Sequence, residues 1–98
     1  MIVETAGVLF RRDARRDDWY FVPLTREASD DIREVPRPER GFGSIPVLVS
    51  VGSSSWRTSI FPDAARGVYV LPLKRSVRER EGISEGDTVR ARLDVLDG

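Results

Sequence analysis

Two segments of this chain have the two-residue period of a half-buried β-strand. Apolar side chains occupy every second position of residues 45–51 and again of residues 89–95. Because successive side chains of a strand point to opposite faces, each segment predicts a strand with one buried face. Further strands are predicted at residues 2–10, 19–24, 56–61 and 68–73, and short helices at residues 25–35 and 74–81. The chain is expected to form a β-rich α+β domain of about six strands and two short helices.

The length of 98 residues is sufficient for one domain, residues 1–98, and too short for two. A single domain has a single core, to which every predicted element contributes apolar side chains. We expect these seven residues to be buried in it: Val47, Val49, Ile60, Leu71, Val77, Val89 and Leu93.

Two segments half a chain apart share a sequence pattern. Residues 19–26 read WYFVPLTR and residues 68–75 read VYVLPLKR, so that Tyr, Pro, Leu and Arg match without a gap at an offset of 49 residues. In both segments a predicted strand runs through Pro-Leu directly into a predicted helix. The repeat suggests an internal duplication, with halves of about residues 1–49 and 50–98 related by an approximate two-fold axis. Chance similarity between two strand–helix junctions is the alternative.

The composition excludes several classes of chemistry. The chain has 16 basic and 16 acidic residues, and it has no histidine and no cysteine. Disulfides, zinc fingers, thiol catalysis and histidine-based triads are therefore excluded. Zero net charge makes nucleic acid an unlikely partner, because a general nucleic-acid binder carries a basic excess. No apolar run reaches the roughly 18–20 residues that span a bilayer.

One candidate site emerges from the pattern of cations. Lys74 and Arg78 lie one turn apart on the second predicted helix, where like charges are unfavourable unless an anion lies between them. Arg57 and Ser59 share the strand face opposite to Trp56. If that face meets the start of the helix, the four polar residues form a binding site for a small anion. The alternative is that carboxylates of the protein itself neutralise these cations.

Three stretches carry a family resemblance: GFGSIPVLVSVG at 41–52, WRTSIFPDAARGVYVLPLKRSVRE at 56–79 and EGISEGDTVRARLDV at 81–95. Together they resemble the bacterial domain of unknown function family 1905, whose name assigns no activity. The second half also resembles, more distantly, the swapped-hairpin barrels of the AbrB/MazE type. That resemblance implies a small double-split β-barrel capped by the two helices. Many AbrB-like domains are DNA-binding dimers.

These observations together predict a small bacterial, cytoplasmic β-barrel binding module for a small anionic ligand or a protein partner. A monomer and a homodimer are both compatible with the sequence. One alternative is an AbrB-like DNA-binding regulator or antitoxin, an inference from fold alone. A second alternative is an enzyme whose chemistry would depend on Lys74 or on carboxylates. Because the sequence has no recognisable catalytic constellation, we expect no catalytic residue, no metal and no cofactor.

Overall fold

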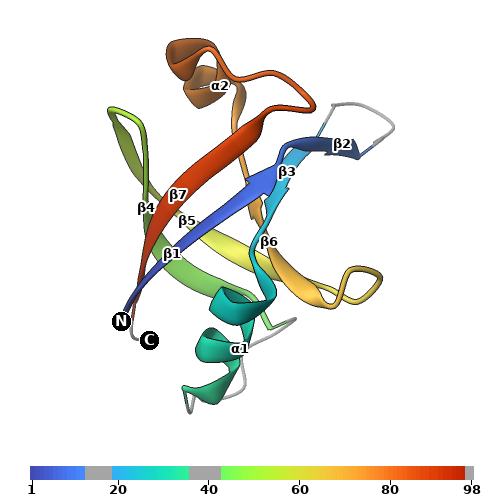
Figure 1. The fold of residues 1–98 in the computed structure, drawn as a ribbon. Helices are drawn as coiled ribbons and strands as arrows, with labels where there is room; N and C mark the ends of the chain where they lie inside the picture. The colour runs from blue at the N-terminus through green and yellow to red at the C-terminus, as the bar shows by residue number, and fades with distance from the viewer. Residues whose placement is uncertain (13–18, 36–42, 97–98) are drawn as a thin grey trace.

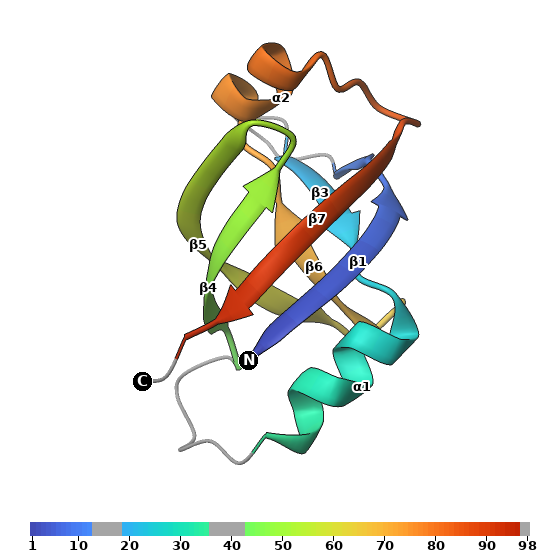
Figure 2. The ribbon, with the colours of Figure 1, turned by 60° about the vertical axis from the view of Figure 1, so that its left-hand side comes forward.

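The fold is a curled antiparallel sheet with one short helix at each end (Figures 1 and 2). A computed structural model describes residues 1–12, 19–35 and 43–96. In this part of the chain the elements are β1 (Ile2–Val8), β2 (Phe10–Arg12), β3 (Trp19–Pro23), α1 (Arg26–Glu34), β4 (Ile45–Val51), β5 (Ser54–Asp63), β6 (Val68–Pro72), α2 (Arg75–Glu81) and β7 (Thr88–Val95). The seven strands described form a half-barrel in the order β1-β7-β4-β5-β6-β3-β2. The predicted β-rich fold with two short helices is confirmed.

The extra strand arises where the predicted strand over residues 2–10 divides at Leu9. The Leu9 N–H donates to the carbonyl of Asp87 at 2.9 Å, and the Leu9 carbonyl accepts from the N–H of Gly86 at 2.9 Å. Before this point β1 pairs with β7, and after it β2 pairs with β3. The division depends on a turn almost 80 residues further along the chain, so local sequence patterns do not reveal it.

All seven residues that we expected in the core are buried in one cluster. Ile60, Leu71 and Leu93 are completely inaccessible to solvent. The helices close the two ends of the curl, α1 through Ala28 and Ile32 and α2 through Val77. No helix of the described residues is long and apolar enough to cross a membrane.

The pairing of β3 with β6 places the two copies of the sequence repeat around one point. Val22 lies opposite Leu71, and these two residues are 49 positions apart. The N–H of Leu24 donates to the backbone carbonyl of Tyr69 at 2.9 Å, and the N–H of Leu73 donates to the backbone carbonyl of Tyr20 at 2.9 Å. The two leucines occupy the same position of the repeat, 49 residues apart, and so do the two tyrosines, so the two bonds are equivalent. The ladder therefore has the local two-fold relationship that the repeat predicts.

The two prolines of the repeat coincide with the places where neighbouring strands separate. The β5–β6 ladder contains only the pairs from Phe61↔Val70 to Asp63↔Val68. If the ladder continued in the same register, Pro72 would lie opposite Ser59. Proline has no N–H, so it cannot continue the ladder. Pro23 occupies the corresponding position of β3, next to the end of the β2–β3 ladder. Each proline therefore lies next to the end of a ladder, and beyond Pro72 the sheet opens.

Candidate functional site

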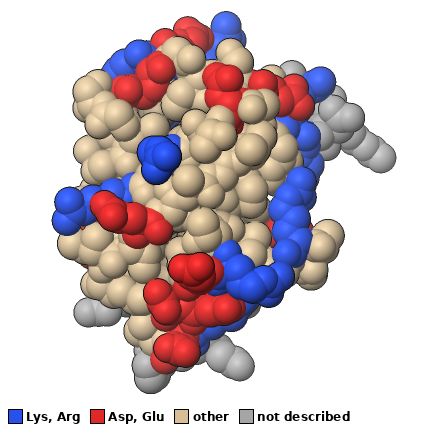
Figure 3. Space-filling model, viewed as in Figure 1, with Lys and Arg blue, Asp and Glu red and all other residues tan. Residues whose placement is uncertain are grey.

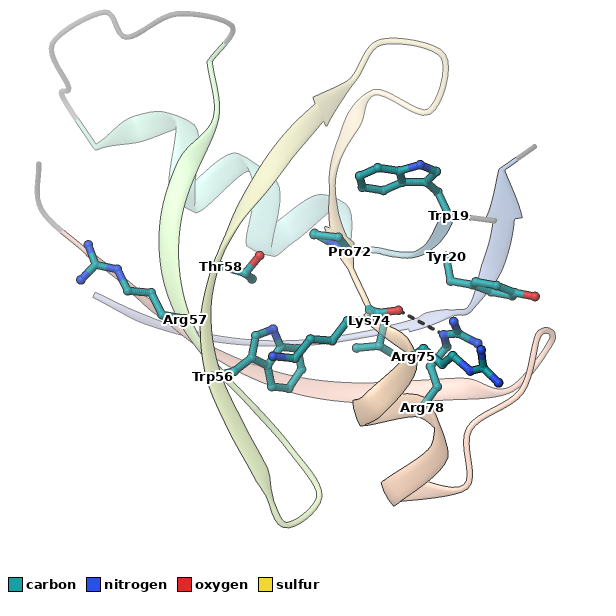
Figure 4. A pocket seen from close by; sticks show the side chains of 10 residues that line it. Trp19, Tyr20, Trp56, Arg57, Thr58, Pro72, Lys74, Arg75 and Arg78 are labelled. Carbon is teal, nitrogen blue, oxygen red and sulfur yellow. Dashed lines mark hydrogen bonds between the residues drawn. The ribbon is translucent and has the colours of Figure 1, made fainter. Parts of the chain in front are cut away.

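The opening between β5 and β6 is a groove of about 590 Å³ that also borders β3 and α2 (Figure 4). Its walls combine aromatic and basic residues. They comprise Trp19, Tyr20 and Trp56, the basic residues Arg57, Lys74, Arg75 and Arg78, and Thr58, Pro72 and Leu73. No carboxylate is among the described residues that line it. A groove with these walls is suited to an anion that also has an apolar surface.

The strand face that meets the groove is the opposite of the one predicted. Along β5, Trp56 and Thr58 point toward the groove, whereas the side chain of Arg57 points away from Lys74 and Arg78 (Figure 4). By strand alternation Ser59 lies on the same outer face as Arg57. The structure thus brings together two of the four predicted residues through their side chains. The outer face cannot meet α2, because α2 packs Val77 into the core inside the curl.

Arg57 nevertheless borders the groove through its backbone, whereas Ser59, two residues further along β5, is not among the described residues that line it. A two-residue turn joins Val51 to Ser54, so even-numbered residues of β5 exchange hydrogen bonds with β4. The N–H and C=O groups of Arg57 and Ser59 therefore face the β6 side, as those of Phe61 do where β6 is still paired. On this side of β5 the described ladder with β6 begins only at Phe61, so Arg57 and Ser59 have no strand partner there. The groove thus has a free strand edge along one wall.

Lys74 supplies a charge that has no counter-ion among the described residues. It is the N-cap residue of α2, and its side chain is exposed and makes no capping hydrogen bond. Arg75, by contrast, is paired with Glu79 at 2.7 Å. Lys74 is therefore the cation of the groove that is best placed to bind an anion.

Arg78 is held in place by the protein itself. Its Nε donates to the carbonyl of Leu73 at 3.1 Å, shown as a dashed line in Figure 4. Its guanidinium carbon lies 3.8 Å from the centre of the Tyr20 ring, which is a close cation–π contact. Arg78 thus connects α2 to β3 across the floor of the groove and contributes positive charge from a fixed position.

The two helix segments differ in charge although the whole chain is neutral. Helix α1 has four acidic and two basic residues, whereas residues 74–81 have four basic and two acidic residues. Figure 3 shows acidic side chains near α1, and further acidic side chains near α2. The groove lies next to α2, and its described lining has basic residues and no carboxylate, so an anionic ligand would be attracted to it.

The first half of the chain closes the gap that corresponds to the groove. Gly7 stands three residues before Phe10, as Thr58 stands three before Phe61. A Cβ atom at Gly7 would overlap the carbonyl oxygen of Pro23, so that glycine permits β1 and β3 to touch. In the second half, the larger Thr58 stands at this place and the strands remain apart.

The start of each helix shows the same difference between the halves. The Oγ1 of Thr5 accepts a hydrogen bond from the N–H of Thr25 at 2.8 Å, and Thr25 caps α1 by accepting from Ala28. Trp56 corresponds to Thr5 at the same offset as Thr58 to Gly7, 51 residues. Lys74 corresponds to Thr25 at the offset of the sequence repeat, 49 residues. Trp56 and Lys74 do not make the hydrogen bonds that Thr5 and Thr25 make, and the larger Trp56 side chain keeps β5 apart from the start of α2.

Glu81 fixes α2 against the turn between β4 and β5. Its carboxylate accepts hydrogen bonds from Ser54 Oγ at 2.6 Å, Ser53 Oγ at 3.0 Å and Ser53 N–H at 3.3 Å. The bonds from Ser54 and then Ser53 hold the pKa of the Glu81 carboxyl below its ordinary value. Gly52 has φ +56°, and a Cβ there would overlap this carboxylate. The contact sets the position of α2, and with it one wall of the groove.

Sequence reasoning did not include the aromatic residues in the site. Trp56 and Tyr20 are partly buried against the core, and Trp19 is 51% exposed. Residues on predicted strands of a small domain are normally assigned to its core, and only the separation of β5 from β6 gives these rings a free side. The available signal was Pro72, a proline at a strand end.

The structure defines a small β-rich domain with a groove that basic and aromatic residues line. Residues 6–93 match the model of the family described as Domain of unknown function (DUF1905), so the chain belongs to that family. This confirms the resemblance seen in the sequence. The match does not bear on the AbrB/MazE-type resemblance, which stays a prediction. No curated protein matches the chain.

Proposed function

We propose that the protein is a non-catalytic binding module whose ligand, an organic anion with an apolar body, occupies the groove between β5 and β6. The observation that carries this proposal is the lining of the groove. Every charged residue among its described walls is basic, and three aromatic side chains accompany them. In a chain with no net charge, this is a local concentration of cations.

The basic and the aromatic residues of the groove contribute to binding in separate ways. Lys74, which has no counter-ion among the described residues, pairs with the anionic group. Trp56 and Trp19 cover the apolar part of the ligand and remove it from water, which contributes roughly 25 cal/mol per Å² of apolar surface buried. An inorganic anion would use the first contribution alone and should bind more weakly than an organic one.

Intrinsic tryptophan fluorescence tests this proposal directly. The chain has two tryptophans, Trp19 and Trp56, and both line the groove. Titration with benzoate, phenyl phosphate and naphthalene-2-sulfonate should give saturable fluorescence changes, and inorganic phosphate should bind at least several-fold more weakly. Lys74→Ala should weaken binding of the organic anions about tenfold. The matched control is Arg90→Ala, which removes an exposed cation of β7 outside the groove.

Two results would contradict the proposal. One is the absence of a saturable change with any of the three organic anions. The other is equal binding by Lys74→Ala and the unaltered protein, because the charge attributed to Lys74 would then be irrelevant.

We further infer that the curled sheet is a double-split β-barrel built from two duplicated halves, about residues 1–49 and 50–98. The support is the ladder centred on Val22 and Leu71, together with the end of the β2–β3 ladder beside Pro23 and of the β5–β6 ladder beside Pro72. The cytoplasmic location and the choice between monomer and homodimer stay predictions.

A further inference from the structure

We propose that the natural occupant of the groove is the C-terminal segment of another protein, bound as a short added strand along β5 with its terminal carboxylate at Lys74. This inference rests on the proposed function and specifies its ligand. The central observation is the free backbone edge at Arg57 and Ser59, opposite Pro72.

The free edge has a repeat that an extended peptide matches. Arg57 and Ser59 each direct one N–H and one C=O to the side of β5 that has no strand partner, and residues two apart in a strand are separated by about 6.5–7 Å. A small aromatic anion can satisfy one of these groups, whereas an extended backbone supplies donors and acceptors at the same repeat. Pro72 has no N–H to offer, so it does not compete for the carbonyl groups of β5.

The direction of the added strand follows from the sheet. Strand β6 runs antiparallel to β5 and leads directly to Lys74 at the start of α2. A peptide that pairs antiparallel with β5 therefore runs in the same direction as β6, and its C-terminal end points to Lys74. Antiparallel pairing is the arrangement that all the strand pairs described in this sheet adopt.

Charge and apolar surface agree with such an occupant. The terminal carboxylate meets Lys74 and the fixed positive charge of Arg78. Alternate side chains of the peptide lie against Trp56 and Trp19, so apolar residues are favoured near its end. The unpaired edge between Arg57, which borders the groove, and Phe61, where β6 begins to pair, is short and limits the bound segment to roughly four residues.

Peptide titrations followed by tryptophan fluorescence test the proposal. The probes are N-acetylated pentapeptides with valine, leucine or phenylalanine at alternate positions and a free C-terminal carboxylate. They should bind at least tenfold more tightly than the same peptides ending in an amide. Single backbone N-methylation of the tightest binder should weaken binding at least tenfold at alternate positions and have little effect at the positions between them, because only every second residue faces β5.

A pair of substitutions at one position tests the protein side. Ser59→Pro removes the N–H that faces the groove but no bond to β4, and Ser59→Ala retains that N–H while removing the hydroxyl on the outer face. We expect Ser59→Pro to lose at least tenfold in peptide affinity and Ser59→Ala to keep it. Circular dichroism verifies that both variants are folded, and benzoate binding verifies that the groove persists in Ser59→Pro.

The outcomes separate this inference from the proposed function. If the organic anions bind but the peptides do not, or if neither N-methylation nor Ser59→Pro affects peptide binding, the added-strand inference is wrong and the binding module stands. If neither peptides nor organic anions bind, both are wrong. If Ser59→Pro does not fold, the N-methylation series with the unaltered protein decides the question.

Discussion

The guanidinium of Arg78 lies over the ring of Tyr20, with 3.8 Å between the guanidinium carbon and the ring centre. The same side chain donates to the carbonyl of Leu73 at 3.1 Å. One cation of the groove therefore serves the structure, while Lys74, four residues earlier, has no counter-ion among the described residues. Two similar charges on one helix thus have separate roles.

Substitution of these two cations should separate stability from binding. Arg78→Ala should lower the stability of the unliganded protein by about 1–2 kcal/mol, because it removes a cation–π contact and a hydrogen bond. Lys74→Ala, which removes an exposed side chain, should change stability by less than about 0.5 kcal/mol. Thermal melting without ligand measures both. An unchanged Tm for Arg78→Ala would show that its guanidinium is not a structural contact.

The Glu81 contact should make the protein sensitive to acid. Its carboxyl has a lowered pKa in the folded state, so the stabilisation is present at neutral pH and is lost as the pH falls below about 4.3, the ordinary glutamate pKa. Glu81→Gln should therefore have a lower urea midpoint than the unaltered protein at pH 7, and the difference should shrink toward pH 3. Glu79→Gln, which alters an exposed ion pair of the same helix, is the control. A difference that stays constant with pH would contradict this assignment.

Asp63 should account for part of the acid sensitivity that Glu81→Gln retains. Burial by itself raises the pKa of the Asp63 carboxyl, but hydrogen bonds from Arg66 and the charges of Arg12 and Arg66 outweigh it and lower the pKa. The sign is the same as for Glu81, so its stabilisation is also lost in acid. Arg12→Ala should reduce the loss of urea midpoint between pH 7 and pH 3, since Arg12 lies 2.8 Å from this carboxylate.

Gly7→Ala should destabilise the protein by about 1–3 kcal/mol, the usual cost of an added methyl group in a closely packed place. The new Cβ would overlap the carbonyl oxygen of Pro23, which is backbone and cannot move aside without shifting β3. Thr58→Ala, at the corresponding position of the open half, should cost less than about 1 kcal/mol. Urea denaturation of the two variants provides the comparison. Equal stabilities would show that β1 and β3 do not need to touch.

Leu93→Asp should unfold the domain. Leu93 is completely buried between Val3 and Val49, so an aspartate there would be an unpaired buried charge that costs several kcal/mol. Leu48→Lys is the control, because Leu48 is 45% exposed and lies opposite Asp94. A cooperative melt of Leu93→Asp near the Tm of the unaltered protein would contradict the strand register.

Double-stranded DNA should bind weakly, with a Kd of about 10⁻⁴ M or higher at physiological salt. The chain has no net charge, and Arg75 and Arg78 at the groove already have partners. Fluorescence anisotropy with a labelled duplex measures the affinity at two salt concentrations. Tight binding with a steep salt dependence would favour the AbrB-like regulator over the binding module.

Local patterns were sufficient to locate the strands and helices, except that they did not reveal the division of residues 2–10 between β1 and β2. The alternation in residues 45–51 and 89–95 identified two strands whose apolar faces are buried. Thr25 caps α1 with its side-chain oxygen, as threonine commonly does at a helix start, and Gly82 takes the left-handed conformation that a C-cap glycine allows. These features depend on neighbours within a few residues, so the sequence contains them directly.

The candidate site could be predicted only in part from local sequence patterns. Lys74 and Arg78 could be placed together because one helix turn separates them. Which face of β5 would meet that helix could not be predicted, because alternation distinguishes two faces without stating which neighbour each of them has. The contribution of Arg57 and Ser59 through backbone groups is likewise a property of strand pairing.

The sequence by itself determined the strand-rich architecture, the buried residues, the neutral charge and the repeated Pro-Leu junction. The tertiary structure decided that the junctions lie side by side, that the gap closes at Gly7 and that it remains open at Thr58. The physical reason is that a strand edge, a cleft or an unneutralised cation is defined by residues distant in sequence. Whether Lys74 has a partner depends on which chains the fold brings within a few ångströms, and no local pattern encodes that distance.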